Sequence, residues 1–307
     1  MSDTQFPEAP AAQPEQVFSR EVVPLPEEVQ ATLATIAGCV DTLGERIGVD
    51  LKGRFVPERV HLFQTLEDYR ASWREAGTRV HPQSIGGHVL SSNRTALVQG
   101  LSTDLFTVAH EASHALFQGP NIMDDSPAGP QVWGQEQKGV AESLMDLFAI
   151  ELTRPLGPVK GSLGYAAMDI ITDAVIQTIT DKQRQPLDQT KVLIMGAIAD
   201  RQTHVFTRLV ADALGEDGLQ AYMNTTGLED IVTLTMLARK LGLKQAQNNL
   251  CAFMLGREVE VYGQKVKHNR PVRTLLRHVG RFAVRFLAPP PPQTKTIVTS
   301  LYDVNPK

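Results

Sequence analysis

The chain has 307 residues, of which 42% are hydrophobic and 21% charged, values typical of a folded protein with a large core. A net charge of −4 argues against a general nucleic-acid binder, which normally carries a basic excess. The chain shows neither a basic N-terminus followed by an apolar run nor an apolar stretch long enough to span a bilayer. We therefore expect a cytoplasmic protein. Secretion by a route that uses no cleaved apolar signal stays an alternative.

Residues 1–25 are rich in Pro, Gln, Glu and Ala, a composition that predicts a disordered tail. Apolar residues at helical spacing then predict a helix from Pro26 through Arg46. A short strand at 59–63, a helix capped by Thr65, and two strands at 85–90 and 95–99 follow. Gly86 and Gly87 indicate either close approach of another backbone or a bulge, and the sequence leaves both open.

The next segment, Thr107–Leu116, contains His-Glu-x-x-His within a pattern of apolar residues at helical spacing. His110 and His114 are one helical turn apart on one face, so both imidazoles can reach one metal ion. Glu111 lies on a neighbouring side of the same helix, where its carboxylate can hold a metal-bound water instead of the metal. Two nitrogen ligands, an open coordination position and a carboxylate base are what a zinc hydrolase needs.

A third ligand is expected from the apolar helix at 139–148, where Glu142 and Asp146 lie on one face. Glu142 can complete a His-His-Glu site, and Asp146 can accept the free N–H of a ligand histidine and fix its tautomer. Glu136 is the rival third ligand, less favoured because it lies near the start of this helix and has no paired acid. The alternative for Glu142 and Asp146 is a pair of exposed acids.

With these residues the chain resembles the gluzincins, the thermolysin-like metallopeptidases, whose second signature is Gly-x-x-Asn-Glu-x-x-Ser-Asp. Gly139, Glu142 and Asp146 occupy the matching positions, whereas Ala141 and Met145 replace the usual Asn and Ser. The resemblance covers roughly residues 59 to 150. It implies zinc bound by His110, His114 and Glu142, with Glu111 as general base and Asp146 as the hydrogen-bond partner of His110. It also implies a small sheet before the zinc helix, with the substrate backbone lying along an edge strand.

The fold class that follows is α+β: a zincin-like small sheet with active-site helices, then a mainly helical lobe. The expected units are the tail at 1–25, the zincin-like subdomain at 26–158, the helical subdomain at 159–256 and a C-terminal region at 257–307. Helices are predicted near 165–181, 188–214, 217–225, 228–241 and 243–255. Family members commonly stabilise the carbonyl oxygen with His or Tyr. His204 is the first choice, because its neighbours are polar within an apolar helix, and Tyr165 and Tyr222 are the alternatives.

The C-terminal region begins with a hairpin predicted at 256–268. Residues 270–287 then alternate arginines with apolar residues as a basic amphipathic helix does, followed by four prolines at 289–292. Such a helix can bind an anionic membrane or a partner, but packing against the body with its arginines solvated is the favoured interpretation. The oligomeric state is not encoded in any motif.

The leading hypothesis is therefore a zinc-dependent metallopeptidase that acts on a peptide or protein substrate, with Zn²⁺ as cofactor and no nucleic-acid partner. A second hypothesis is a non-catalytic module, regulatory or toxin-associated, that zinc stabilises. The presence of Glu111 argues against it, since a purely structural site needs no base. A third is a helical interaction protein that works through its C-terminal basic helix.

Overall fold

The structure, a computed structural model, describes residues 27–57, 60–62, 87–92, 95–100, 104–118, 138–157, 165–226 and 229–268. The predicted tail, the helix capped by Thr65, Glu136, the basic helix at 270–287 and the proline run lie outside these residues. No helix among the described residues is long and apolar enough to cross a membrane.

The N-terminal part pairs one long helix with a small sheet. Helix α1 (Glu27–Ile47) buries Val29, Leu33 and Ile36 along one face, which confirms the predicted helix. The strands are β1 (Val60–Leu62), β2 (Gly87–Ser92) and β3 (Thr95–Gly100). Strand β3 is central, parallel to β1 and antiparallel to β2. The sheet comes directly before the histidine helix, as the sequence predicts.

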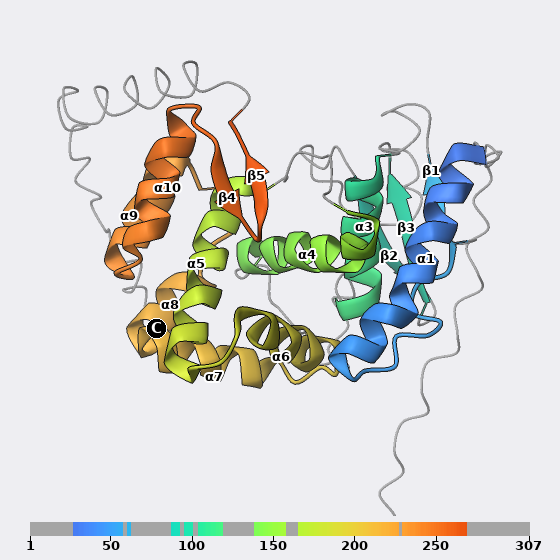
Figure 1. Ribbon diagram of the computed structural model, residues 1–307, viewed down its shortest axis with the longest axis horizontal. Helices are drawn as coiled ribbons and strands as arrows, with labels where there is room; N and C mark the ends of the chain where they lie inside the picture. Colours follow the sequence, from blue (N-terminus) through green and yellow to red (C-terminus); the bar gives the residue numbers. More distant parts are fainter. Residues whose placement is uncertain are drawn as a thin grey trace, which may run out of the picture.

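Two crossing helices follow the sheet. Helix α3 (Leu105–Ser113) carries the His-Glu-x-x-His motif and continues into a π-helical turn, η2 (His114–Gln118). Helix α4 (Lys138–Thr153), which ends in the 3₁₀ turn η5 (Arg154–Leu156), packs against α3. Figure 1 shows α3 upright beside the sheet, with α4 lying across it at the centre of the molecule. The two motifs found in the sequence therefore meet where α3 and α4 cross.

The rest of the described chain is mainly helical, as predicted. Its elements are α5 (Ala166–Gln183), α6 (Leu187–Ala199), α7 (Thr203–Leu214), α8 (Glu216–Met223), α9 (Ile231–Lys240), α10 (Lys244–Met254) and the hairpin β4 (Val259–Val261) with β5 (Gln264–Val266). Helix α5 packs against α4 on one side and against α6, α7, α9 and α10 on others. The hairpin lies between α10 and α4 (Figure 1). The predicted hairpin is confirmed.

The predicted single helix at 188–214 is wrong, because α6 ends at Ala199 and α7 begins at Thr203. Arg201 adopts the left-handed conformation, with φ of 60°, and the N–H of Gln202 bonds back to the carbonyl of Ala197 at 2.7 Å. This is a helix-ending turn of the kind that usually contains glycine. Since arginine takes that position here, the sequence lacks the usual signal for the break.

Buried hydrophobic residues from α1, α3 and α4 join those of α5 to α10 and the hairpin in one core cluster. The core reaches from Val29 on α1 to Val266 on β5. Large side chains such as Phe117, Phe148 and Phe206 are almost fully buried within it. The proposed boundary between subdomains near residue 158 stays a prediction. The crossing of α3 and α4 is anchored in this core, so its side chains are held by packing from both parts of the chain.

Candidate metal centre

The start of α3 is fixed by a side-chain cap. Asp104 accepts hydrogen bonds from the backbone N–H of Thr107 at 3.0 Å and from its hydroxyl at 2.7 Å. A capping carboxylate satisfies a free N–H of the first turn and interacts favourably with the helix dipole. Beyond the cap, seven residues of α3 are buried, including both His110 and Glu111. The polar residues of the motif therefore lie inside the protein, where each needs a partner.

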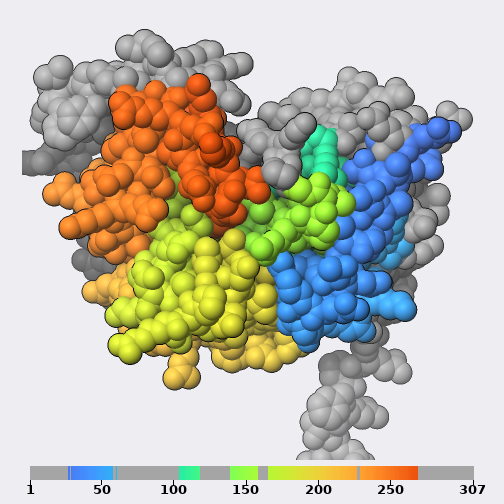
Figure 2. Space-filling view, viewed as in Figure 1, coloured from blue at the N-terminus to red at the C-terminus, as the bar shows by residue number. Residues whose placement is uncertain are grey.

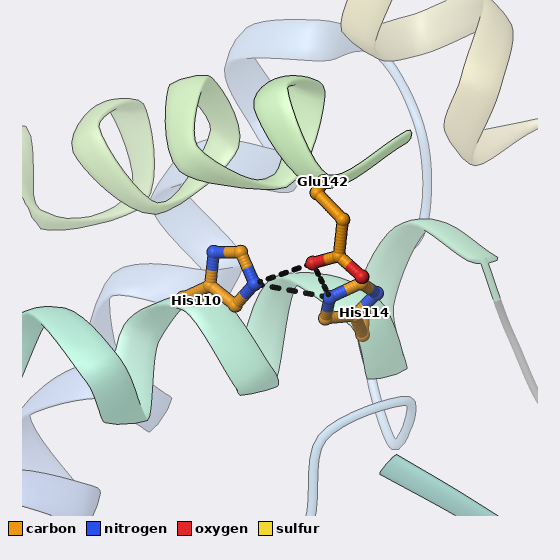
Figure 3. A group of neighbouring side chains, drawn as sticks. All are labelled: His110, His114 and Glu142. Atoms are coloured by element: carbon orange, nitrogen blue, oxygen red, sulfur yellow. Dashed lines mark hydrogen bonds and ion pairs between the residues drawn. The ribbon is translucent and has the colours of Figure 1, made fainter. Parts of the chain in front are cut away.

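Three potential ligand atoms converge where α3 crosses α4. The Nε2 atoms of His110 and His114 are 3.1 Å apart, and Oε2 of Glu142 lies 3.2 Å from the first and 3.4 Å from the second. Figure 3 shows the imidazole rings of His110 and His114 and the Glu142 carboxylate, which comes from α4, pointing toward one another. The structure thus brings together the three residues that the sequence predicts as ligands.

These separations fit a tetrahedral metal ion. Zinc binds histidine nitrogen and carboxylate oxygen at about 2.0–2.1 Å, and tetrahedral geometry then separates neighbouring ligand atoms by about 3.3–3.4 Å. The three measured separations of 3.1, 3.2 and 3.4 Å lie close to that value. Two imidazoles and one carboxylate are also the donor types that zinc takes in catalytic sites with three protein ligands. The residues present therefore fit zinc, with a fourth position left for water or substrate.

The other ring nitrogen of His110 is held by α4 as well. Its Nδ1 lies 2.6 Å from Oδ1 of Asp146, which is 1% exposed. Burial would lower the pKa of His110, but the carboxylates of Asp146, Glu142 and Glu111 outweigh it and raise the pKa well above its ordinary value. An Nδ1–H donated to Asp146 leaves Nε2 with the lone pair that a metal ligand needs. The structure thus places Asp146 in the position that the sequence predicts.

Electrostatics distinguish the two glutamates of the site. Burial would raise the pKa of Glu142, but the neighbouring histidines, His114 above all, outweigh burial and lower it. For Glu111 the balance is reversed: burial dominates and raises its pKa, while the two histidines oppose this effect. Oε2 of Glu111 has no hydrogen-bond partner among the described residues. Glu142 is thus suited to remain an anionic ligand, and Glu111 to exchange a proton.

One of the three candidates for the carbonyl-stabilising residue lies at the site, and it is not the first choice. The Tyr165 ring stands nearly parallel to that of His110, with ring centres 6.3 Å apart, and its hydroxyl interacts with Glu142. Burial and the nearby carboxylates raise the pKa of Tyr165, which keeps the phenol a donor. His204 is instead exposed in the first turn of α7. Tyr222 is fully buried and donates to Thr172. The structure does not bring His204 or Tyr222 to the three ligand atoms.

Sequence reasoning did not identify a buried polar group behind Asp146. Asp169, in the first turn of α5, is 0% exposed, and its carboxyl group interacts with Asp146 and Ser143. The hydroxyl of Ser143 lies 2.9 Å from that of Tyr262, from the turn between β4 and β5. Of Asp169, Ser143 and Tyr262, only Asp169 has a recognisable signal in the sequence, because it is an acid within the apolar start of α5.

Comparison of the chain with protein-family models, with curated proteins and with solved structures found no match in any of the three. The class that the site suggests, a His-His-Glu metal centre with an adjacent glutamate, therefore depends on the geometry and on the two sequence motifs. The function built on it is a proposal.

Proposed function

We propose that this protein is a zinc-dependent metallopeptidase of the gluzincin type. The observation that carries the proposal is the convergence of His110, His114 and Glu142 at separations that suit one zinc ion, with Glu111 buried beside them. The small sheet before α3 and the crossing of α3 with α4 support a zincin-like arrangement. The choice of a peptide as substrate comes from the resemblance of the two motifs to that family.

His110, His114 and Glu142 would hold the ion, and Asp146 would orient His110 through its Nδ1–H. When bound, zinc supplies a Lewis acid that polarises the scissile carbonyl and acidifies the attacking water. Glu111 takes the proton from that water and passes it to the leaving nitrogen. Its raised pKa favours this role, because the carboxyl group must hold the proton between the two transfers. Tyr165 offers an O–H to the carbonyl oxygen as negative charge develops there.

The substrate backbone has a place beside these groups. Strand β2 is an outer strand of the sheet formed by the described residues, and it contacts α3. An outer strand presents unpaired N–H and C=O groups, to which an extended peptide can add as a further strand. A peptide along β2 would lie next to the helix that carries Glu111.

The direct test replaces the base and leaves the ligands in place. Glu111→Gln should lower the hydrolysis rate of fluorescently labelled casein by about 10²–10⁴-fold, the usual contribution of a general base. Zinc content should stay unchanged, because Glu111 is not among the three converging ligands. Glu216→Gln, an exposed glutamate of α8, is the matched control and should keep full activity. A Glu111→Gln protein that hydrolyses casein at the normal rate would exclude this mechanism.

The same assay separates Tyr165 from His204. Tyr165→Phe keeps the ring against His110 and removes only the O–H, so the rate should fall by about 10²-fold while zinc stays bound. His204→Ala should leave the rate unchanged, since His204 is exposed on α7. The reverse pattern would return the role to His204.

A further inference from the structure

A second buried carboxyl group stands directly behind the one that holds His110. Asp169 is 0% exposed and Asp146 is 1% exposed, and the two side chains interact where α5 packs on α4. Oδ1 of Asp146 is 2.6 Å from Nδ1 of His110, so only its Oδ2 remains for another partner. The chain from the ligand atoms inward therefore runs from His110 through Asp146 to Asp169.

Three oxygen atoms of this pair lack a conventional donor. Oδ2 of Asp146 and both carboxyl oxygens of Asp169 receive no hydrogen bond from an N–H or O–H of the described residues. A buried polar atom without a partner costs about 1–3 kcal/mol, and more when the group is charged. Two facing buried carboxylates cannot both be ionised, whereas one shared proton gives them a strong hydrogen bond. One proton between the two groups thus removes both penalties.

The surroundings assign that proton to Asp169. Oδ1 of Asp146 accepts the hydrogen bond from Nδ1–H of His110, whereas no cationic side chain pairs with Asp169 among the described residues. Burial raises the pKa of Asp169 well above its ordinary value and the charge of Asp146 raises it further, which together outweigh the opposing effects of the Ser143 hydroxyl and of His110. Asp169 is therefore the acid and Asp146 the acceptor.

The hairpin of β4 and β5 packs on α5 and contacts Ser143 of α4, close to this pair. Tyr262, in the turn, has φ of 53° and is followed by Gly263 with φ of 81°, a two-residue turn that favours Asn-Gly. A tyrosine in this left-handed conformation costs roughly 1–3 kcal/mol. Its side chain is nevertheless 3% exposed, and its O–H donates to the carbonyl of Ser143 at 3.2 Å. Figure 2 shows the hairpin, in orange-red, lying against α4 in green. The strained turn thus inserts a buried phenol next to Ser143, the residue that interacts with Asp169.

We propose that Asp169 is a positioning residue of the candidate metal centre: its carboxylic acid donates a hydrogen bond to Asp146 and holds it against Nδ1 of His110. With one oxygen on His110 and the other on Asp169, the Asp146 carboxylate cannot rotate. His110 is then fixed in the tautomer and orientation that direct Nε2 toward His114 and Glu142. This inference deepens the proposed function and rests on it.

Two substitutions of Asp169 test whether it acts as a neutral hydrogen-bond donor or as a charged carboxylate. Asp169→Asn keeps the shape and an N–H donor for Asp146 but cannot ionise, whereas Asp169→Leu has similar volume and no donor. Zinc affinity, measured by competition with a chelating dye, should stay within about threefold of wild type for Asn and fall by about 10–100-fold for Leu. If Asp169 acted as a carboxylate, or if the pair held a cation, Asn would be as damaging as Leu. That result would overturn the proposal.

An infrared measurement tests the proton without zinc and without catalysis, and it needs only the Asn variant. The difference spectrum between metal-free wild type and Asp169→Asn at neutral pH should contain a carboxylic-acid C=O band that shifts in D₂O. Carboxylate bands alone would overturn the proposal. An acid band in a protein that binds no zinc would overturn the zinc function, and with it the role of Asp169 at a metal centre, while keeping the hydrogen bond to Asp146.

Discussion

Helix α4 carries two glutamates with little exposure, the partly buried Glu142 and the buried Glu151, about two and a half turns apart, and their surroundings differ in kind. Glu151 is paired with cations that keep their charge: Lys191 at 3.0 Å, and Arg46 at 2.6 Å. Glu142 instead lies beside His110 and His114, which can give up their protons to bind a metal, and it also interacts with the Tyr165 hydroxyl. In both cases burial would raise the pKa and the neighbours lower it. Glu151 is thus satisfied by the protein alone, whereas Glu142 has the neighbours that the proposed metal centre requires.

The comparison teaches that a buried carboxylate with a lowered pKa does not by itself mark a functional site. What distinguishes Glu142 is the chemistry of its histidine partners and the neighbouring Glu111, whose Oε2 has no hydrogen-bond partner among the described residues. Glu151 instead ties α1, α4 and α6 together through Arg46 and Lys191. One end of the helix is held by ion pairs, and the other carries the carboxylate of the proposed metal centre.

The largest effect that we expect to separate Glu151 from Glu142 is on the free energy of unfolding. Glu151→Gln removes the hydrogen-bonded carboxylate partner of Lys191, which is 6% exposed. Breaking a buried pair from one side costs about 3–5 kcal/mol of unfolding free energy, because the remaining charge stays buried. Urea denaturation measures this loss. Glu258→Gln, which removes the exposed pair with Lys265, is the control and should cost less than about 1 kcal/mol. Equal losses in the two variants would mean that the Glu151 cluster is no structural anchor.

A smaller effect concerns Asp173 on α5, a third carboxyl group, which lacks the close cations of Glu151. Burial raises its pKa to about 6, although Lys191 and the backbone N–H of Tyr262 oppose the shift. A carboxyl group whose pKa is raised in the folded state favours folding at low pH, and this contribution is lost as the pH rises from about 4 to about 6. Asp173→Asn removes the penalty, so it should stabilise the protein by about 1–3 kcal/mol above pH 7 and by much less near pH 4.5.

Urea denaturation of both proteins at pH 4.5 and 7.5 measures that difference. A gap between wild type and Asp173→Asn that is independent of pH would show that Asp173 is ionised throughout. Asp212→Asn, on α7, provides a control for the general effect of removing one negative charge.

Much of the candidate site is readable from the sequence because its signals are local. The spacing of His110 and His114 needs only helical periodicity, and Asp146 follows Glu142 by one turn. The contribution of the hairpin is not readable, because Ser143 and Tyr262 are 119 positions apart and no pattern links them. Asp169 depends in the same way on how α5 packs against α4.

The preference for His204 shows how polar neighbours mislead. In the sequence, Asp200, Arg201 and Gln202 form a polar patch inside what the pattern predicts as one long helix, and this favours a functional histidine. In the structure these residues form the exposed break between α6 and α7. Their polarity reflects contact with solvent. The break itself was hidden because Arg201, not glycine, adopts the left-handed conformation that ends α6.

Zinc titration of three proteins tests the central claim most directly: wild type, Glu142→Gln and Glu151→Gln, at a temperature where circular dichroism shows all three folded. We predict one zinc per chain for wild type and for Glu151→Gln, with similar affinities. Glu142→Gln should bind zinc more than about 100-fold more weakly, since losing a ligand costs more than losing a residue that orients one. Unchanged zinc affinity in Glu142→Gln, or no zinc binding by wild type, would contradict a His110–His114–Glu142 metal centre.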